Sequence, residues 1–261
     1  MTLALNTGIL YGPVNSRRYG RSLGINLSPC DYKLCSFNCI YCHFGWTDVT
    51  AMTAVDHAKD LPAPEEVIRT VDEALQSDLE FNQVTFSGNG EPTLYPEFAV
   101  IVDAVRDLID QWRPDVKLAL LSNSTGLLRD DVRRVVPKID LPVFKLDAGT
   151  DRVFRQINRP ARGIQFSDVL LLLRALDNIY LQTVLVDGEP NNTSKRALES
   201  WYERVAEIKP KAVHLYSIDR PVPHTKIKLV PPERLRAIAR EGEERTGIPI
   251  HVYTAQSAST R

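Results

Sequence analysis

Short apolar runs alternate with amphipathic stretches along most of the chain. The runs rich in aliphatic and β-branched residues predict strands at 22–27, 83–88, 116–124, 143–149, 179–188, 212–219 and 248–253. Apolar residues at helical spacing, several of them after a polar first turn, predict helices at 62–77, 96–111, 129–136, 166–175, 195–208 and 232–246. In the helix that starts at Pro96, we expect Val100, Ala104 and Leu108 to share the buried face.

This alternation favours an α/β fold built from parallel β/α units. Six main units suit a partial (β/α)6, TIM-like barrel. We find no internal repeat, low-complexity stretch or break in composition that would mark a second domain. The sequence therefore predicts a single domain over residues 1–255 and a flexible C-terminal tail at 256–261.

Composition narrows the class of protein. Of the 261 residues, 43% are hydrophobic and 25% are charged, which is typical of a soluble globular protein. No apolar run approaches the roughly 20 residues of a membrane span, and the N-terminus lacks the basic start of a secretory signal. We expect a cytoplasmic protein with reduced cysteines and no membrane partner.

The net charge of −1 gives no global bias toward nucleic acid. The arginines are unevenly placed, however, and two groups of them flank the segments that carry the candidate chemistry. One group is Arg17, Arg18 and Arg21, and the other is Arg152, Arg155, Arg159 and Arg162. This pattern has two interpretations. The arginines are either solvated surface charges or a patch that binds an anionic substrate.

All four cysteines lie in the string CDYKLCSFNCIYC, at Cys30, Cys35, Cys39 and Cys42. The last three have the spacing C-x3-C-x2-C, with Tyr41 before the final one. Three thiolates on one loop can hold three corners of a [4Fe–4S] cluster and leave one iron open to a substrate or cofactor. Structural zinc and disulfides fit such close spacing poorly. A closed electron-transfer cluster with Cys30 as the fourth ligand stays open.

A glycine-rich turn follows the predicted strand at 83–88. Its residues are Gly88, Asn89, Gly90, Glu91 and Pro92. Glycines at the end of a strand let the backbone approach a ligand closely because no Cβ intervenes. Exposed carbonyl groups in such a turn can accept hydrogen bonds from an ammonium group.

Together, the segments Cys35–Cys42 and Gly88–Pro92 resemble the radical S-adenosylmethionine (SAM) superfamily. The resemblance implies a partial (β/α)6 barrel and a [4Fe–4S] cluster held by Cys35, Cys39 and Cys42. It also implies SAM as cofactor, bound near Tyr41 and by the turn Gly88–Pro92. Reductive cleavage of SAM would give methionine and a 5′-deoxyadenosyl radical that abstracts a substrate hydrogen. Asn89 stands where the family usually has glycine.

Polar residues at the predicted strand ends extend this candidate site, because loops converge at the carboxyl ends of barrel strands. By analogy with the family, we expect SAM contacts from Ser122, Asn123, Lys145, Asp147 and Gln182. Lys145 and Asp147 share one face of their strand, as a buried pair or as a solvated pair at the rim.

Two of the residues considered are candidates for a catalytic role: Cys30 and Lys145. The thiol of Cys30 is either a hydrogen-atom donor to a substrate radical or a buried spectator.

The segments 12–42, 146–160 and 214–223 look similar to relatives of the wyosine-type tRNA-modifying synthases. Those synthases hold a second cluster with three further cysteines, and only Cys30 lies outside the triplet here. The resemblance implies a flavodoxin- or ferredoxin-type electron donor and a tRNA base as substrate. Two alternatives remain: a radical SAM enzyme that acts on a metabolite or a glycyl-radical partner protein, and a non-catalytic iron–sulfur electron carrier. The oligomeric state is open.

Overall fold

The computed structural model describes residues 2–16 and 20–254. The predictions for Arg17, Arg18 and the tail at 256–261 lie outside these described residues. Contacts divide the chain into two compact units. The first unit comprises Ala4–Ser36 and Asp48–Val143, and the second comprises Met1–Leu3, Phe37–Thr47 and Phe144–Arg261.

The first unit is built on a sheet of parallel strands with one antiparallel edge. Its strands are β1 (Leu10–Ser16), β2 (Gly20–Ile25), β5 (Gln83–Phe86) and β6 (Lys117–Ser122). β1 pairs antiparallel with β2, and β2, β5 and β6 pair in parallel in that order. Leu118, Ala119 and Leu120 of β6 are fully buried, as its continuous apolar run predicts.

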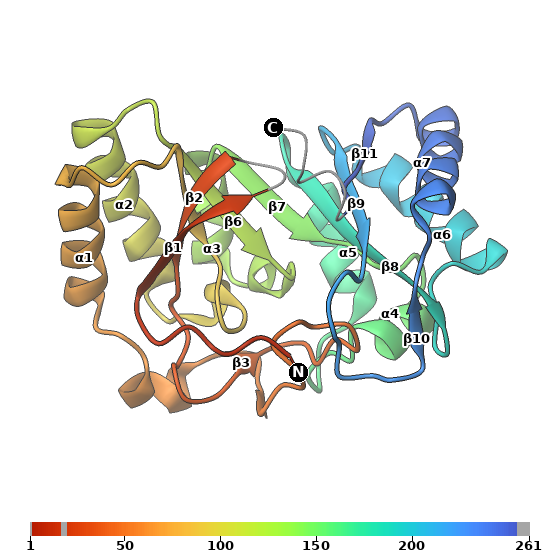
Figure 1. Cartoon of the computed structure of the whole chain (residues 1–261), viewed down its shortest axis with the longest axis horizontal. Helices are drawn as coiled ribbons and strands as arrows, with labels where there is room; N and C mark the ends of the chain where they lie inside the picture. The colour runs from red at the N-terminus through yellow and green to blue at the C-terminus, as the bar shows by residue number, and fades with distance from the viewer. Residues whose placement is uncertain (1, 17–19, 255–261) are drawn as a thin grey trace. The chain divides into compact units, whose positions relative to one another are not determined.

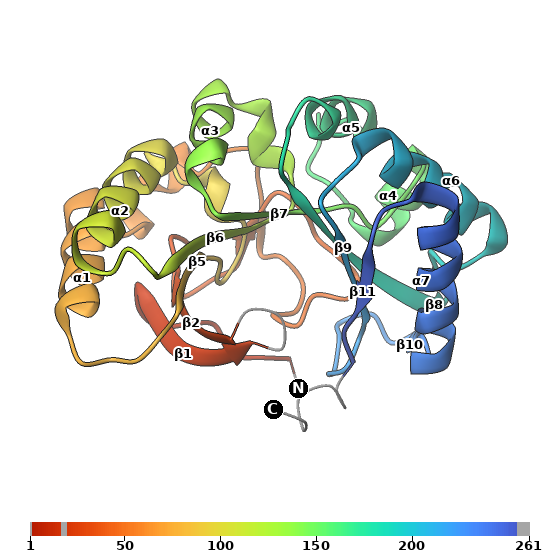
Figure 2. The same ribbon diagram turned by 90° about the horizontal axis from the view of Figure 1, so that it is seen from above.

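Helices α1 (Pro64–Gln76), α2 (Phe98–Trp112) and α3 (Asp130–Val135) cover one face of this sheet (Figures 1 and 2). α1 begins with proline and two glutamates and buries Val67, Val71 and Leu75, one residue per turn. The prediction that the face of α2 with Val100 is buried is wrong, because Val100 is 54% exposed. The helix instead buries the stripe that contains Ile101, Val105 and Ile109.

The second unit has parallel strands β8 (Tyr180–Gly188), β9 (Val213–Ser217) and β11 (Ile250–Val252). The short strand β10 (Ile227–Leu229) pairs antiparallel with β8. The helices of this unit are α4 (Asp151–Ile157), α5 (Phe166–Arg174), α6 (Lys195–Ile208) and α7 (Pro232–Thr246). Figure 2 shows α5, α6 and α7 on one side of the β8–β9–β11 strands.

Shorter elements complete the chain. β7 (Leu141–Lys145) ends earlier than the predicted strand at 143–149, so Asp147 follows it. The two-residue strands β3 (Leu34–Cys35) and β4 (Val49–Thr50) pair in parallel. The 3-10 turns are η1 (Val55–Asp60), η2 (Pro92–Leu94), η3 (Thr125–Leu128) and η4 (Val136–Lys138). None of the helices in the described part of the chain is long and apolar enough to cross a membrane.

Candidate functional site

The turn Gly88–Pro92 follows β5 and packs against the segment that leads to Cys35. Gly88 has φ 134°, a conformation that side chains rarely adopt. A Cβ on Gly90 would lie 1.7 Å from the carbonyl oxygen of Leu34. The backbone conformation at Gly88 and the close approach of Leu34 at Gly90 therefore both require glycine, as the sequence pattern indicates.

The side chain of Asn89 is buried and fully engaged within the first unit. Its Oδ1 accepts hydrogen bonds from the backbone N of Asn6 (2.7 Å) and from Asn6 Nδ2 (3.0 Å). Its Nδ2 donates to the carbonyl oxygens of Asn6 (2.9 Å) and Pro29 (3.0 Å). Asn89 thus ties the turn to the residues beside Cys30, which explains how a residue other than glycine serves at this position.

Glu91 links the turn to the end of β6. Its carboxylate accepts hydrogen bonds from Ser122 Oγ (2.7 Å) and from the backbone N of Asn123 (2.6 Å). It also accepts from the backbone N (3.2 Å) and the hydroxyl (2.5 Å) of Thr93. Burial raises the pKa of Glu91 above its usual value, although these hydrogen bonds oppose the shift.

Asn123 connects this carboxylate to the first cysteine of the motif. Its Nδ2 lies 3.6 Å from Cys35 Sγ and donates to Ser36 Oγ at 2.8 Å. Its Oδ1 accepts from the backbone N (3.0 Å) and the hydroxyl (2.8 Å) of Thr125. We call Glu91, Ser122, Asn123 and Cys35 the Cys35 network.

Arg129 fixes the segment after the turn and was not identified from the sequence. Its guanidinium donates to the carbonyl oxygens of Thr93 (3.0 Å), Tyr95 (2.8 Å) and Pro96 (2.6 Å). One arginine therefore satisfies three carbonyl groups of the chain that continues from Glu91. No local sequence signal reveals such a contact, because it joins residues more than thirty positions apart.

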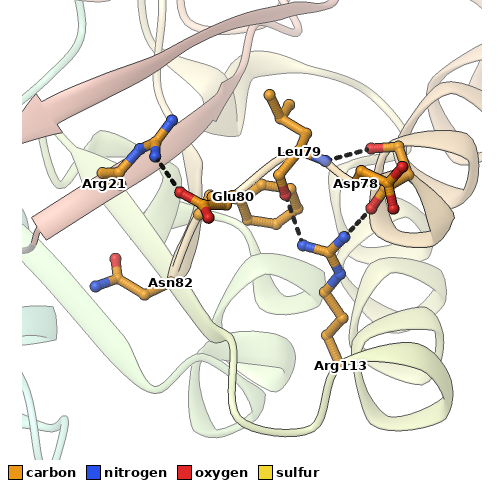
Figure 3. Close-up of a pocket in the computed structure, with 8 residues that line it drawn as sticks. Arg21, Asp78, Leu79, Glu80, Asn82 and Arg113 are labelled. Atoms are coloured by element: carbon orange, nitrogen blue, oxygen red, sulfur yellow. Dashed lines mark hydrogen bonds and ion pairs between the residues drawn. The ribbon is translucent and has the colours of Figure 1, made fainter.

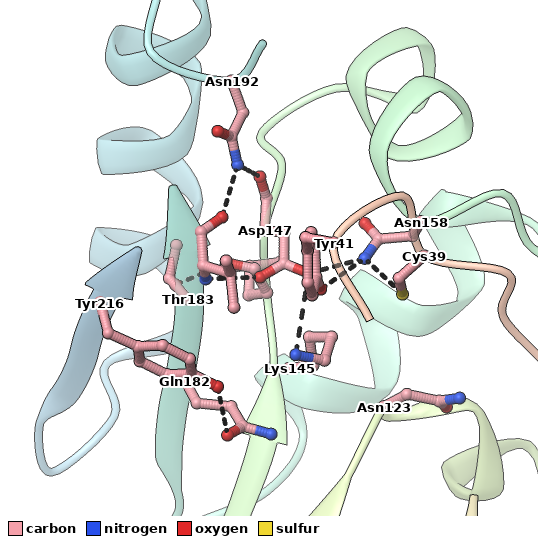
Figure 4. A network of polar contacts seen from close by, with 12 residues as sticks. Cys39, Tyr41, Asn123, Lys145, Asp147, Asn158, Gln182, Thr183, Asn192 and Tyr216 are labelled. Carbon is pink, nitrogen blue, oxygen red and sulfur yellow. Dashed lines mark hydrogen bonds and ion pairs between the residues drawn. The ribbon is translucent and has the colours of Figure 1, made fainter. Parts of the chain in front are cut away.

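A second network surrounds Cys39 in the second unit (Figure 4). The amide Nδ2 of Asn158 lies 3.5 Å from Cys39 Sγ and donates to Asp147 Oδ2 at 2.6 Å. The hydroxyl of Tyr41 donates to the same carboxylate oxygen. Burial and the neighbouring Asp147 carboxylate raise the pKa of Tyr41. Cys39, Tyr41, Asp147 and Asn158 form the Cys39 network.

Lys145 joins this network through Asp147, with Nζ 3.9 Å from Oδ2. Its ammonium group also lies 5.3 Å from the centre of the Tyr41 ring. The sequence allowed either a buried pair or a solvated pair at the barrel rim. The buried pair is confirmed, because the side chains of Lys145 and Asp147 are 13% and 0% exposed. Burial opposes the charged form of Lys145, but Asp147, acting together with Tyr216, Cys39 and Cys42, outweighs burial and raises the pKa of Lys145.

The backbone beyond β7 is fixed by β8. Asp147 Oδ1 accepts from the backbone N of Val184 at 2.8 Å. Asn192 Nδ2 donates to the carbonyl oxygens of Asp147 (2.9 Å) and Val184 (2.8 Å). Gln182 is buried, and its Oε1 accepts from the hydroxyl of Tyr216 at 3.2 Å. The contact from Val184 orients the Asp147 carboxylate, and the contact from Asn192 fixes the Asp147 backbone.

The cysteine loop is attached to the end of α4 by its backbone. Ile40 N donates to the carbonyl of Ile157, and Asn38 N donates to those of Asn158 and Arg159, each at 3.0 Å. The turn within the motif is closed by Cys42 N, which donates to the carbonyl of Cys39 at 3.2 Å.

The predicted site residues therefore fall into two sets. The first unit holds Cys30, Cys35, Gly88, Asn89, Gly90, Glu91, Pro92, Ser122 and Asn123. The second holds Cys39, Tyr41, Cys42, Lys145, Asp147 and Gln182. Cys30 is a half-buried free cysteine whose pKa is raised by burial and by Asp31. Asn158 and Asn192 are functional candidates that the sequence did not reveal.

A hollow of about 500 Å³ lies elsewhere in the first unit, where β2 and β5 begin (Figure 3). The two arginines that line it have structural partners. Arg21 pairs with Glu80 at 2.7 Å, and Arg113 donates to the carbonyl groups of Leu75, Ser77 and Leu79. This end of parallel strands serves stability in barrel proteins, and the hollow contains none of the motif residues.

The donor set suits an iron–sulfur cluster. Cys35 and Cys39 are buried and Cys42 is half-buried, and all three are free thiols. Thiolates are the ligands that iron–sulfur clusters select. The two buried cysteines each have an asparagine amide within hydrogen-bonding distance of sulfur. Burial raises the pKa of Cys39 to about 11, and the hydrogen bond from Asn158 opposes that shift by favouring the thiolate form.

Comparison with known proteins identifies the family. Residues 31–200 match the Radical SAM superfamily. The chain is 30% identical over 238 residues to the UPF0026 protein of Methanocaldococcus jannaschii, covering 89% of this chain and 69% of that protein. It is also 30% identical over 267 residues to the UPF0026 protein of Synechocystis, covering 92% and 94% of the two chains.

Solved structures share the fold. A radical SAM methyltransferase from Sphaerobacter thermophilus matches with a TM-score of 0.65 at 15% identity, over 89% of this chain and 66% of that one. TYW1 with a lysine–pyruvate adduct bound matches with a TM-score of 0.61 at 18% identity, over 86% and 73%.

The chain belongs to the radical SAM superfamily, and within it to the UPF0026 family. The resemblance stated from the motifs is confirmed, as is the partial-barrel α/β fold. The protein is thus an enzyme that uses a [4Fe–4S] cluster and SAM, as members of this superfamily do.

Proposed function

We propose that the enzyme cleaves SAM reductively and modifies a base of an RNA, with tRNA as the substrate. When bound, a reduced cluster would supply the electron for cleavage of SAM to methionine and a 5′-deoxyadenosyl radical, the species that would abstract a substrate hydrogen. The residues described above bind and orient these groups.

The observation that carries the proposal is the arrangement of buried polar groups around the motif cysteines. In the first unit, Glu91 fixes the Gly88–Pro92 turn to the strand end that presents Asn123 to Cys35. In the second, Asp147 and Asn158 orient Tyr41 and Cys39. Burying so many polar groups costs stability unless each is hydrogen-bonded, and such ordering is typical of sites that hold a cofactor in one pose.

Cys35, Cys39 and Cys42 would hold the cluster, and the backbone of the Gly88–Pro92 turn would hold the ammonium group of SAM. The side chains of Asn89 and Glu91 are occupied by protein contacts, so their role is to shape the turn. The ammonium of Lys145 is suited to an anionic group such as a carboxylate. A flavodoxin- or ferredoxin-type protein would deliver the electron.

Two observations support an RNA base as substrate. The chain resembles the wyosine-type enzymes in fold, and arginines are concentrated on and beyond α4, the helix that supports the cysteine loop. A phosphate-rich substrate matches such a surface.

The test is an anaerobic assay with reconstituted cluster, SAM and a strong reductant, with and without unfractionated tRNA. We expect 5′-deoxyadenosine to form, to increase with tRNA, and to disappear in Cys35→Ala, Cys39→Ala and Cys42→Ala. Cys30→Ala is the matched control and should keep SAM cleavage. SAM cleavage could occur at the same rate with and without tRNA, and the nucleoside composition of the tRNA could stay unchanged. In that case the proposal of an RNA substrate is wrong.

A further inference from the structure

Trp46 presents a partly exposed indole four residues after Cys42. The guanidinium carbon of Arg159 lies 4.8 Å from the centre of its ring, and the ring of His224 meets it edge-on at 6.2 Å and 76°. These contacts hold the indole in place, yet 39% of Trp46 remains exposed. An ordered aromatic surface beside charged groups is a stacking platform for a planar partner.

All three residues are attached to the loop that carries Cys39 and Cys42. The backbone N of Asn38 donates to the carbonyl of Arg159 at 3.0 Å, and that of His224 donates to the carbonyl of Ile40 at 3.3 Å. Thr47, next to Trp46, donates through its backbone N to Asn38 Oδ1 at 2.8 Å. A partner on Trp46 would therefore be held next to the cysteine loop.

Arginines extend the platform along α4. Arg152, Arg155 and Arg159 are exposed and follow the spacing i, i+3, i+7, which places the first two on one face of the helix that leads to Arg159. Arg155 is paired with Asp151 at 2.7 Å. Among the described residues, neither Arg152 nor Arg162 has a carboxylate partner. The surface thus keeps positive charge for an anionic ligand.

We propose that Trp46, Arg152 and Arg159 bind the RNA substrate, with an unpaired base stacked on the indole and phosphates on the arginines. This inference rests on the function proposed above and names the surface that serves it. Proteins recognise single-stranded RNA by this combination of aromatic stacking and cationic contacts. Charge alone would also attract an acidic protein, but such a partner has no use for an exposed, laterally fixed indole.

The experiment measures binding of unfractionated tRNA and of heparin to the cluster-loaded protein at two salt concentrations. The variants are Trp46→Ala, Trp46→Phe and the double change Arg152→Gln with Arg159→Gln. The matched controls are Trp112→Ala, an exposed tryptophan in the first unit, and Arg236→Gln with Arg240→Gln on α7 of the second unit. Circular dichroism and the cluster absorbance check that each variant is folded and loaded.

We expect Trp46→Ala to weaken tRNA binding roughly tenfold, Trp46→Phe to retain most of it, and neither to change heparin binding. The double arginine variant should weaken both ligands and lower the slope of log K against log salt by about 0.7 for each lost phosphate contact. Equal tRNA affinities in the Trp46 variants and wild type would overturn the proposal. So would an equal loss with heparin, or effects as large in the α7 control.

Failure of this inference can be distinguished from failure of the proposed function. If tRNA stimulates SAM cleavage equally in wild type and in the Trp46 and arginine variants, the function stands and the surface is wrong. If wild type neither binds tRNA nor responds to it, the RNA substrate fails and the surface fails with it. Binding of an acidic protein that competes with heparin would then identify the other kind of partner.

Discussion

The side-chain amide of Asn158 bridges Cys39 and Asp147, with Nδ2 3.5 Å from the sulfur and 2.6 Å from the carboxylate. Asn123 contacts Cys35 in the same way, at 3.6 Å. Each buried cysteine of the motif thus has one amide donor from an element distant in sequence. Hydrogen bonds to the sulfur ligands are among the factors that set the reduction potential of an iron–sulfur cluster.

Replacing Asn158 by leucine should lower the reduction potential of the cluster. The N–H···S contact stabilises the more negative, reduced state, and leucine cannot supply it. The same change leaves the buried Asp147 carboxylate with one donor fewer, so the free energy of unfolding should fall by about 2 kcal/mol. A potentiometric titration followed by electron paramagnetic resonance gives the potential, and urea unfolding gives the stability.

Asn178→Gly is the control for that change. Asn178 is exposed and has φ 60°, a conformation that glycine adopts readily. Its substitution should alter neither quantity. An Asn158→Leu protein with an unchanged potential would show that the amide serves packing alone.

Replacing Gly90 by alanine should displace the turn that follows β5. The added Cβ would lie 1.7 Å from the Leu34 carbonyl oxygen, which is backbone and cannot rotate away. We expect a loss of about 3 kcal/mol in the free energy of unfolding and weaker SAM binding, because the shift moves the turn. Calorimetric titration with SAM measures the second effect.

Gly8→Ala provides the comparison, since its Cβ would meet only an ordinary contact at 3.6 Å. Stability and SAM affinity should stay close to those of wild type. If Gly90→Ala binds SAM as well as Gly8→Ala does, the turn has no part in holding the cofactor.

Sequence patterns predicted the features that depend on neighbouring residues alone, such as buried strands, turns and helix starts. The apolar run of β6, the strand–turn sequence ending in Gly88–Pro92 and the proline-led start of α1 were all found where the sequence placed them. β1 was missed, because Gly12 and Pro13 interrupt its alternation and its pairing shifts between Tyr11 and Val14. α4 was missed because its seven residues offer too few turns for a periodic signal.

Long-range contacts were beyond sequence reasoning. Asn158 meets Cys39 across 119 residues, and Arg129 reaches Pro96 across 33. The face of α2 was misjudged because Val100 and Ile101 begin two apolar stripes of similar strength. Only packing against the neighbouring elements decides which of the two stripes is buried.

The Asp103 carboxylate should make the free energy of unfolding depend on pH in the acidic range. Although burial raises its pKa, ion pairs with Lys138 (2.7 Å) and Arg134 (3.2 Å) lower it below the usual value of 3.8. A depressed pKa means that the stabilisation is present above the unfolded pKa and is lost as pH falls through the folded one. Because the pair is partly exposed, Asp103→Asn should cost only about 0.5 kcal/mol at pH 7.

The check is urea unfolding of wild type and Asp103→Asn at pH 7 and at a series of lower pH values, where the difference should shrink as the pH falls through the lowered pKa of Asp103. Asp107→Asn on the same helix, an exposed carboxylate, is the control. A difference that persists at the lower pH would assign the effect to packing rather than to charge.

Replacing Glu91 by glutamine tests whether the carboxylate orders the site. Ser122, Thr93 and the backbone N of Asn123 all donate to its two oxygens, so an amide NH2 in place of one oxygen must face a donor. Four donors and a single remaining acceptor oxygen cannot all be satisfied. We expect the free energy of unfolding to fall by about 2 kcal/mol, since hydrogen bonds to a buried charge are lost.

The consequence for cofactor binding separates this role from simple stability. SAM at a hundred times its dissociation constant should stabilise wild type by about 2.7 kcal/mol. In Glu91→Gln the turn and Asn123 lose their common anchor, so the same SAM concentration should stabilise the variant far less. Glu97→Gln, at the start of α2, should respond to SAM as wild type does. Equal stabilisation of all three proteins by SAM would show that Glu91 supports the fold without ordering the cofactor site, because a lower baseline stability alone does not change the increment that a ligand adds.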